Sequence, residues 1–257
     1  MPPLPVELVL VLVGISLVAG VGCTTTGAGG VFVTIALYAF TPLSSAEIAG
    51  TAHVVFVAVG VVGAVGFARS GELLETDGRT LAAILSGTSV LGAVAGAYLN
   101  AYVSRRLFSI LLGVLTVITG GVLLYGQIRD LRSIVAVDSS ATSGRLVFGS
   151  VGLFLGITAG LVGIGGPILA VPALVTLGVP MLLALGIAQV QAIFISGFAA
   201  SGYFVQEAIS PFFATITTVP TVIGAIGGWL LAHHVDPDHL ELVLSGILIP
   251  VGLYLIL

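Results

Sequence analysis

Two glycine-rich interruptions of long apolar runs are the part of this sequence best suited to bind a small anion. The first is Gly27-Ala28-Gly29-Gly30, and the second, 136 positions later, is Gly163-Ile164-Gly165-Gly166-Pro167. Glycine lets a helix unwind and be approached closely, and proline at the first position of the resuming helix lacks only an N–H that has no helical partner. Free N–H groups and the positive end of the helix dipole then point at the break. The backbone residues predicted to hold the anion are Gly27, Gly29, Gly30, Gly163, Gly165 and Gly166; the alternative is close helix packing without a ligand.

Three threonines and a cysteine stand immediately before the first break. The hydroxyls of Thr24, Thr25 and Thr26 suit an oxyanion, although threonines in membrane helices often bond carbonyls of their own helix instead. Cys23 is the only cysteine, so no intrachain disulfide forms. Redox or persulfide chemistry at Cys23 needs an activating neighbour, and no basic residue is near in sequence, which favours a packing role.

Buried polar residues follow each break. His53 and Gln189 occupy equivalent positions, 136 apart, in the helices that come next. Polar groups at membrane depth are costly and usually face a cavity or a neighbouring helix. We therefore predict that His53 and Gln189 orient the anion; the alternative for His53 is a bond to neighbouring backbone. Gln191 does not share a helix face with Gln189, so at most one of these two amides is expected to line the site.

Other chemistry is not favoured by the sequence. The loop His233–His239 resembles a metal cluster in composition, but its spacing is not that of a known metal site. Glu47, three residues after Ser44, has the spacing of a capping box. No catalytic triad or paired carboxylates lie at a depth that suits catalysis, and without lysine there is no Walker-type phosphate loop. We expect no enzymatic activity, no cofactor, no metal and no nucleic-acid partner.

The composition indicates which elements position these residues. Hydrophobic residues make up 58% of the 257-residue chain and charged residues only 7%, too few charges for the surface of a soluble protein. The length allows about eight spans of roughly 20 residues each. We therefore predict an all-α, polytopic helical bundle of about eight transmembrane segments in the cell membrane. Its partners are the lipid bilayer and a small anionic substrate, and the sequence permits a homo-oligomer.

The chain divides into two similar halves. The apolar segments 31–41 and 168–178, which directly follow the breaks, are too short to cross a membrane, since each covers about 17 Å. Small-xxx-small spacings, which allow close helix packing in lipid, recur at Gly92/Gly96 and Gly224/Gly228. We predict repeats at 1–127 and 145–257, each with one interrupted helix, joined by a cytoplasmic linker at 128–144.

The arginines predict the orientation, whereas the path of the interrupted helices stays open. Loops 69–79 and 128–145 carry five arginines and the loop near 101–106 carries two, which places the first two loops in the cytoplasm. If each interrupted element crosses the membrane, there are eight spans and the repeats are parallel. If it turns back as a re-entrant hairpin, each half has three full spans and the repeats are inverted.

The residues around the second break resemble a known family. The run AGLVGIGGPILAVPAL, residues 159–174, is similar to the signature of the TauE/SafE sulfite-exporter family of anion permeases, usually close to GxxGxGGG followed by an apolar stretch and a proline, here Pro172. Three positions depart from this pattern. Pro167 stands where a third glycine is common, the first half has Cys23 to Thr26 in place of a short glycine run, and it has Ala36 where the second half has Pro172.

The resemblance implies a secondary transporter of a sulfur-containing or organic anion such as sulfite or a sulfonate, working by alternating access between the two repeats. Three other functions remain open from the sequence. They are a passive anion channel, an intramembrane sulfur-handling protein that uses Cys23, and a non-transporting subunit of a larger membrane complex.

Overall fold

The computed structural model describes residues 5–74, 76–129, 141–234 and 237–257, and this part of the chain is helical with no strand. The first half contains α1 (Val6–Thr25), α2 (Val31–Phe40), α3 (Ser45–Ser70), α4 (Thr76–Asn100) and α5 (Arg105–Arg129), with short 3₁₀ turns at Ala28–Gly30 and Glu72–Leu74. The second half contains α6 (Thr142–Val162), α7 (Pro167–Thr176), α8 (Met181–Val205), α9 (Pro211–Ala232) and α10 (Pro237–Ile256).

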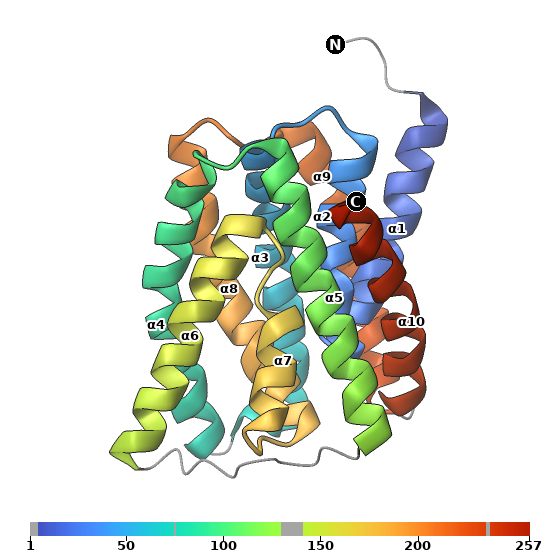
Figure 1. Ribbon diagram of the computed structural model, residues 1–257. Helices are drawn as coiled ribbons and strands as arrows, with labels where there is room; N and C mark the ends of the chain where they lie inside the picture. The colour runs from blue at the N-terminus through green and yellow to red at the C-terminus, as the bar shows by residue number, and fades with distance from the viewer. Residues whose placement is uncertain (1–4, 75, 130–140, 235–236) are drawn as a thin grey trace.

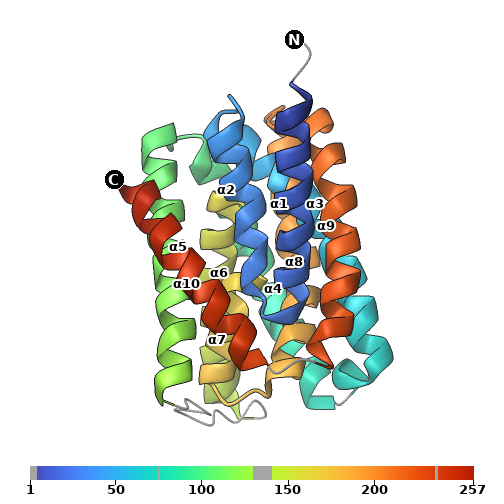
Figure 2. The ribbon, with the colours of Figure 1, turned by 90° about the vertical axis from the view of Figure 1, so that its right-hand side faces the viewer.

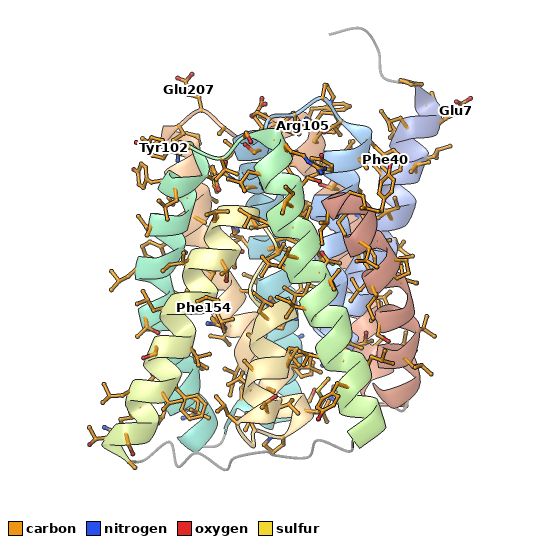
Figure 3. All side chains as sticks on the ribbon, in the orientation of Figure 1. Glu7, Phe40, Tyr102, Arg105, Phe154 and Glu207 are labelled. Carbon is orange, nitrogen blue, oxygen red and sulfur yellow. The ribbon has the colours of Figure 1, made fainter. Side chains whose placement is uncertain are left out.

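Seven of these helices are long and apolar enough to cross a membrane. They are α1, α3, α4, α5, α6, α8 and α9; α10 contributes a shorter apolar helix over its described side chains, Leu242–Ile256. Exposed apolar side chains such as Phe154, which points outward at mid-height of the bundle, are what a lipid-facing surface requires (Figure 3). The predicted all-α, polytopic membrane bundle is therefore confirmed.

Local sequence signals explain where these helices begin and end. The hydroxyl of Ser44 accepts the N–H of Glu47 and the Glu47 carboxylate accepts the N–H of Ser44, so the predicted capping box opens α3. Gly71, with φ of 102°, ends α3 in the left-handed conformation. Pro167 opens α7 at its first position, where a missing N–H removes no helical bond.

Both interrupted elements are hairpins. Figure 2 shows α1 descending from the N-terminal end of the bundle and α2 returning beside it to the same end. Figure 1 shows α6 rising from the opposite end and α7 returning downward. Of the two paths that the sequence left open, the structure has the re-entrant one, so the repeats are inverted.

The small-xxx-small spans pack in equivalent ways in the two halves. α4 lies against α6, as α9 lies against α1. A Cβ added to Gly92 would lie 2.3 Å from the Leu153 carbonyl oxygen, and one added to Gly224 would lie 2.0 Å from that of Leu17. Leu17 and Leu153 are themselves 136 positions apart. The contact between α4 and α6 is therefore equivalent to the contact between α9 and α1. In each half, a helix with small residues packs on the hairpin of the other half.

The described arginine side chains lie at the two ends of the bundle. Among the described arginine side chains, Arg69, Arg79 and Arg145 lie where α3 ends and α4 and α6 begin, at the lower end in Figure 1. Arg105 lies at the upper end, as does Tyr102, an aromatic residue typical of the membrane interface (Figure 3). The lower end is therefore the predicted cytoplasmic face. Most of the predicted linker 128–144, residues 130–140, lies outside the described residues.

Candidate functional site

The structure brings the two glycine breaks into contact with each other's halves. A Cβ on Gly27 would lie 2.7 Å from Val171 Cγ2 and 3.0 Å from the Pro167 carbonyl oxygen, both on α7. In the other direction, the hydroxyl of Thr34 on α2 donates to the carbonyl oxygen of Gly163. Each break therefore touches the half-helix that resumes after the other break, so the two breaks form one central region.

The ring of Phe56 separates the two breaks. Phe56 is on α3, one turn after His53, and only 1% of it is exposed. A Cβ on Gly30 would lie 3.0 Å from Cε1 of the ring, and a Cβ on Gly165 would lie 2.6 Å from Cγ. The equivalent position on α8 is Ala192, so only one of the two repeats supplies an aromatic side chain here.

The polar groups of the first break bond within the protein. The three predicted threonines are buried, and each donates to a carbonyl oxygen: Thr24 to Ala225 at 2.8 Å, Thr25 to Val21 at 3.0 Å and Thr26 to Gly22 at 3.1 Å. Thr26 also accepts the N–H of Ala28 at 3.3 Å. Gly29 packs on α1, because a Cβ there would lie 2.5 Å from Gly22 Cα. These contacts favour the alternative reading of the threonines as helix-bonded.

The second break leaves backbone donors unbonded. Gly163, Gly165 and Gly166 have φ of 70°, 75° and 46°, which lie in the region open mainly to glycine. The N–H of Gly163 closes α6 by donating to the Ala159 carbonyl oxygen at 2.8 Å. Within the described part of the chain, the N–H groups of Gly165, Gly166 and Ile168 donate to no acceptor. The N-terminus of α7 therefore presents free donors at the positive end of its dipole.

His53 and Gln189 each bond the end of a hairpin's first helix. His53 Nε2 lies 3.3 Å from the Gly160 carbonyl oxygen, and its Nδ1 lies 3.2 Å from the Ser196 hydroxyl. Because a carbonyl only accepts, Nε2 carries the proton and Nδ1 accepts from Ser196. Gln189 Nε2 donates to the Cys23 carbonyl oxygen at 2.8 Å. The two residues predicted to orient an anion thus also hold α6 and α1 at equivalent places.

Gln191 is a buried polar side chain that is free to bind a ligand. It is fully buried, and neither its amide nitrogen nor its amide oxygen has a partner among the described residues. It shares a helix face with Ile195, one turn later, and Ile195 Cδ1 would lie 3.3 Å from a Cβ on Gly166. A buried amide without partners is costly. In α3 the equivalent residue is Val55.

Three residues of this region were not among the predicted site residues: Phe56, Thr34 and Gln191. The sequence indicates that at most one of Gln189 and Gln191 lines the site, and Gln189 was predicted. The two amides differ in whether they have a hydrogen-bond partner within the protein, which the sequence does not indicate. Phe56 carries a weak signal, since it lies one turn beyond His53 on the same helix. Thr34 has none, because a hydroxyl in an apolar helix gives no indication of a carbonyl in the other half.

The donors of this region are neutral. The described arginine side chains lie at the ends of helices, away from the breaks, and no group of three or more His, Cys, Asp or Glu that suits a metal occurs among the described residues. In the loop His233–His239, His233 pairs with Glu72 across 3.0 Å; residues 235–236 of that loop lie outside the described residues. An anion in this region would be held by N–H groups and an amide, without a cation.

A comparison with protein-family models agrees with this architecture. The model described as "Sulfite exporter TauE/SafE" matches residues 12–255. A search of curated proteins found no match, and neither did a search of solved structures. The match covers both hairpins, both breaks and nearly every helix, and the members of this family are membrane transporters of sulfite and related anions rather than enzymes. The chain therefore belongs to the TauE/SafE sulfite exporter family and is a multi-pass membrane protein.

Proposed function

We propose that this protein is a secondary transporter of a small sulfur-containing oxyanion, such as sulfite or a short sulfonate, bound at the C-terminal break. The observation that carries the proposal is the set of unbonded N–H groups at the start of α7, those of Gly165, Gly166 and Ile168. The unpartnered amide of Gln191 supports it, because Gln191 shares a face of α8 with Ile195, whose side chain lies near Gly166. Helix N-termini at glycine breaks are where transporters bind anionic groups. Family membership supports the transported class.

The charge of the site favours a singly charged anion. Transfer of an ion from water into a poorly polarisable interior carries a large free-energy penalty, and that penalty grows with the square of the charge. Neutral donors offset this penalty for one charge better than for two, because no described cation lies at the breaks. A sulfonate or hydrogensulfite is therefore preferred to sulfate.

Alternating access is supported by the inverted hairpins. The first hairpin enters from one end of the bundle and returns to it, and the second hairpin does the same at the opposite end. α3 packs on α8 and α5 packs on α10, so equivalent helices of the two halves meet. We propose that the repeats are 1–127 and 145–257, joined by the linker 128–144. Opposite movements of the two repeats would expose the site first to one side of the membrane and then to the other.

Binding of anions to the purified protein tests the site. Sulfite, sulfate, thiosulfate and methanesulfonate are added to the wild-type protein and to Gln191→Leu, and the melting temperature is followed. Because Gln191 has no partner among the described residues, leucine removes no intramolecular hydrogen bond, and the variant is expected to fold. A singly charged oxyanion should raise the wild-type melting temperature, and Gln191→Leu should lose that shift.

Three results would contradict the proposal. An equal shift in Gln191→Leu removes Gln191 from the site, and no shift with any of the four anions removes the substrate class. Loss of all function in Cys23→Ser with binding intact points to sulfur chemistry at Cys23 instead. Flux measured in liposomes separates the channel alternative, because a channel passes ions without dependence on a coupling gradient.

A further inference from the structure

The arginines at the two ends of the bundle differ in whether they form hydrogen bonds within the protein. At the upper end, Arg105 donates to the carbonyl oxygens of Tyr38 at 2.7 Å and Thr41 at 2.9 Å. Arg106, next to it, donates to the carbonyl oxygens of Ile256 and Leu257 at 2.8 and 2.9 Å. At the lower end, Arg79 and Arg145 form no ion pair or hydrogen bond with any described residue. Two guanidinium groups are therefore available on the predicted cytoplasmic face.

Both of these arginines line a cavity on the outside of α4. A cavity of about 410 Å³ is lined by Arg79, Arg145 and Ala83, among others, between the starts of α4 and α6. A second cavity, of about 630 Å³, also includes Arg79 and Ala83 and extends between α4 and α8. The shared residues show that the two cavities adjoin at Arg79.

The second cavity is apolar beyond its entrance. Its wall consists mainly of aliphatic and aromatic side chains, including Leu73, Ala82, Val90, Phe194 and Phe198. Phe194 and Phe198 are 42% and 47% exposed on the surface of α8, where the bundle faces lipid. Two cations at the interface, followed by an apolar groove along the helices, match the head and the tail of a phospholipid.

The equivalent place in the other half of the protein lacks this chemistry. The residue 132 positions after Arg79 is Pro211, and the residue 136 positions before Arg145 is Val9. The counterparts of Phe194 and Phe198 are Ala58 and Val62. Packing between α4 and α6 does not require arginine, because α9 and α1 pack in the same way without it. The packing of these helices therefore does not explain why both arginines line the groove.

We propose that the groove between α4 and α8 binds an anionic phospholipid of the cytoplasmic leaflet, with the phosphate at Arg79 and Arg145. One acyl chain lies along α4 and α8 between Ala83 and Phe198. Arginine suits this role because its planar guanidinium makes paired hydrogen bonds to phosphate oxygens. The site is distinct from the glycine breaks, and its lipid binding does not depend on which anion is transported.

The test compares lipids that differ only in charge. Delipidated wild-type protein is mixed with dioleoyl phosphatidylglycerol or dioleoyl phosphatidylcholine, and bound lipid is counted by native mass spectrometry. A basic residue near an anionic headgroup contributes a factor of roughly five in affinity, so Arg79→Gln/Arg145→Gln should bind phosphatidylglycerol roughly 30-fold more weakly. Arg69→Gln, on the same face but lining neither cavity, is the matched control and should bind as the wild type does.

A second variant tests the acyl chain alone. Ala83 is exposed and lines both cavities, so Ala83→Trp fills the groove while keeping both arginines, and it should also weaken phosphatidylglycerol binding. The proposal is overturned if phosphatidylcholine binds the wild type equally well, if either variant keeps wild-type affinity, or if Arg69→Gln loses as much. It is also overturned if inorganic phosphate stabilises the protein as much as the lipid does, since the site would then take a free anion.

Discussion

The two glycine breaks occupy equivalent places in the inverted repeats, yet the polar side chains near them differ in whether they have partners within the protein. In the first, the hydroxyls of Thr24 to Thr26 and the N–H of Ala28 all have partners within the protein. In the second, the amide of Gln191 has none among the described residues, whereas N–H groups without an acceptor occur at both breaks. The two repeats therefore share a backbone arrangement, and we expect the side chains near each break to decide which one binds the ligand.

A few substitutions account for the difference. The second break has no hydroxyls before it, and Pro167 stands where the first half has Val31, whose N–H donates to the Gly29 carbonyl oxygen. Gln191 replaces the apolar Val55 of the first half. Gln191 adds an amide that has no partner among the described residues, whereas Pro167 lacks the N–H that Val31 has and so leaves its carbonyl partner without that donor. The comparison predicts that the first break governs stability and the second governs binding.

The largest effect on stability is expected when alanine replaces Gly27 or Gly165, the glycines of the two breaks that make close contacts. Gly27→Ala would set a Cβ 2.7 Å from Val171 Cγ2, and Gly165→Ala would set one 2.6 Å from Phe56 Cγ, each at a positive φ. Overpacking and the left-handed backbone together should destabilise each variant by about 2–5 kcal/mol, measured as a fall in melting temperature.

Second-site relief then separates the two breaks. Val171→Ala should restore part of the stability and transport of Gly27→Ala, because it removes the methyl group in closest contact with the added Cβ, whereas the Pro167 carbonyl contact and the positive φ remain. Phe56→Ala should relieve the contact made by Gly165→Ala but restore neither stability nor transport, because it leaves a cavity in place of a buried ring and the backbone at position 165 keeps its positive φ. Equal recovery of transport in both double variants would contradict the comparison.

The next largest effect is on transport in Gln191→Leu. Loss of one hydrogen bond to a charged group removes about 1.5–3 kcal/mol, so kcat/KM for the transported anion should fall roughly 10- to 100-fold. The melting temperature should stay the same or rise, because a buried, unpartnered amide is replaced by an apolar group. The reciprocal change Val55→Gln should neither raise transport nor rescue Gln191→Leu, and a rescue would mean that the two breaks are interchangeable.

A smaller effect is expected at the residues that hold the hairpins. Gln189→Leu leaves the Cys23 carbonyl oxygen without its recorded donor, which should cost about 1–3 kcal/mol of stability. His53→Leu should cost less, because Tyr203 still donates to the Gly160 carbonyl oxygen at 2.9 Å. Thermal melting of the two variants in one detergent decides the order. A more damaging His53→Leu would assign His53 a role beyond holding α6.

Much of the fold could be predicted from the sequence because it depends on patterns within single helices. The short apolar segments after the breaks, the capping box at Ser44 and the small-xxx-small spans each identify a local feature, and the structure contains all of them. The orientation predicted from the arginines stays a prediction, because the structure contains no membrane. The re-entrant path could not be predicted, because a half-length helix has the same composition whether it continues across the bundle or turns back.

The candidate site was harder to predict because it depends on contacts between the halves. Which amide is free, that of Gln189 or Gln191, is decided by the Cys23 carbonyl oxygen, 166 positions away from Gln189. Likewise the hydroxyl of Thr24 has its short bond to Ala225 on α9, which no spacing within α1 indicates. From the sequence these polar side chains are equally suited to bind a ligand. Only the packing of one repeat against the other decides which of them has a partner within the protein.

The smallest expected effect distinguishes the threonines from ligand groups. Thr24→Val removes a 2.8 Å hydrogen bond between α1 and α9 at nearly constant shape, so stability should fall by about 1 kcal/mol. Thr25 donates to Val21 of its own helix at 3.0 Å, and Thr25→Val should change stability by less than about 0.5 kcal/mol, because valine leaves the backbone bonds of the helix in place. Anion affinity, measured by the same thermal shift, should be unchanged in both. A loss of affinity in either variant would mean that its hydroxyl leaves its carbonyl to contact the anion, and the first break would then be a binding break as well.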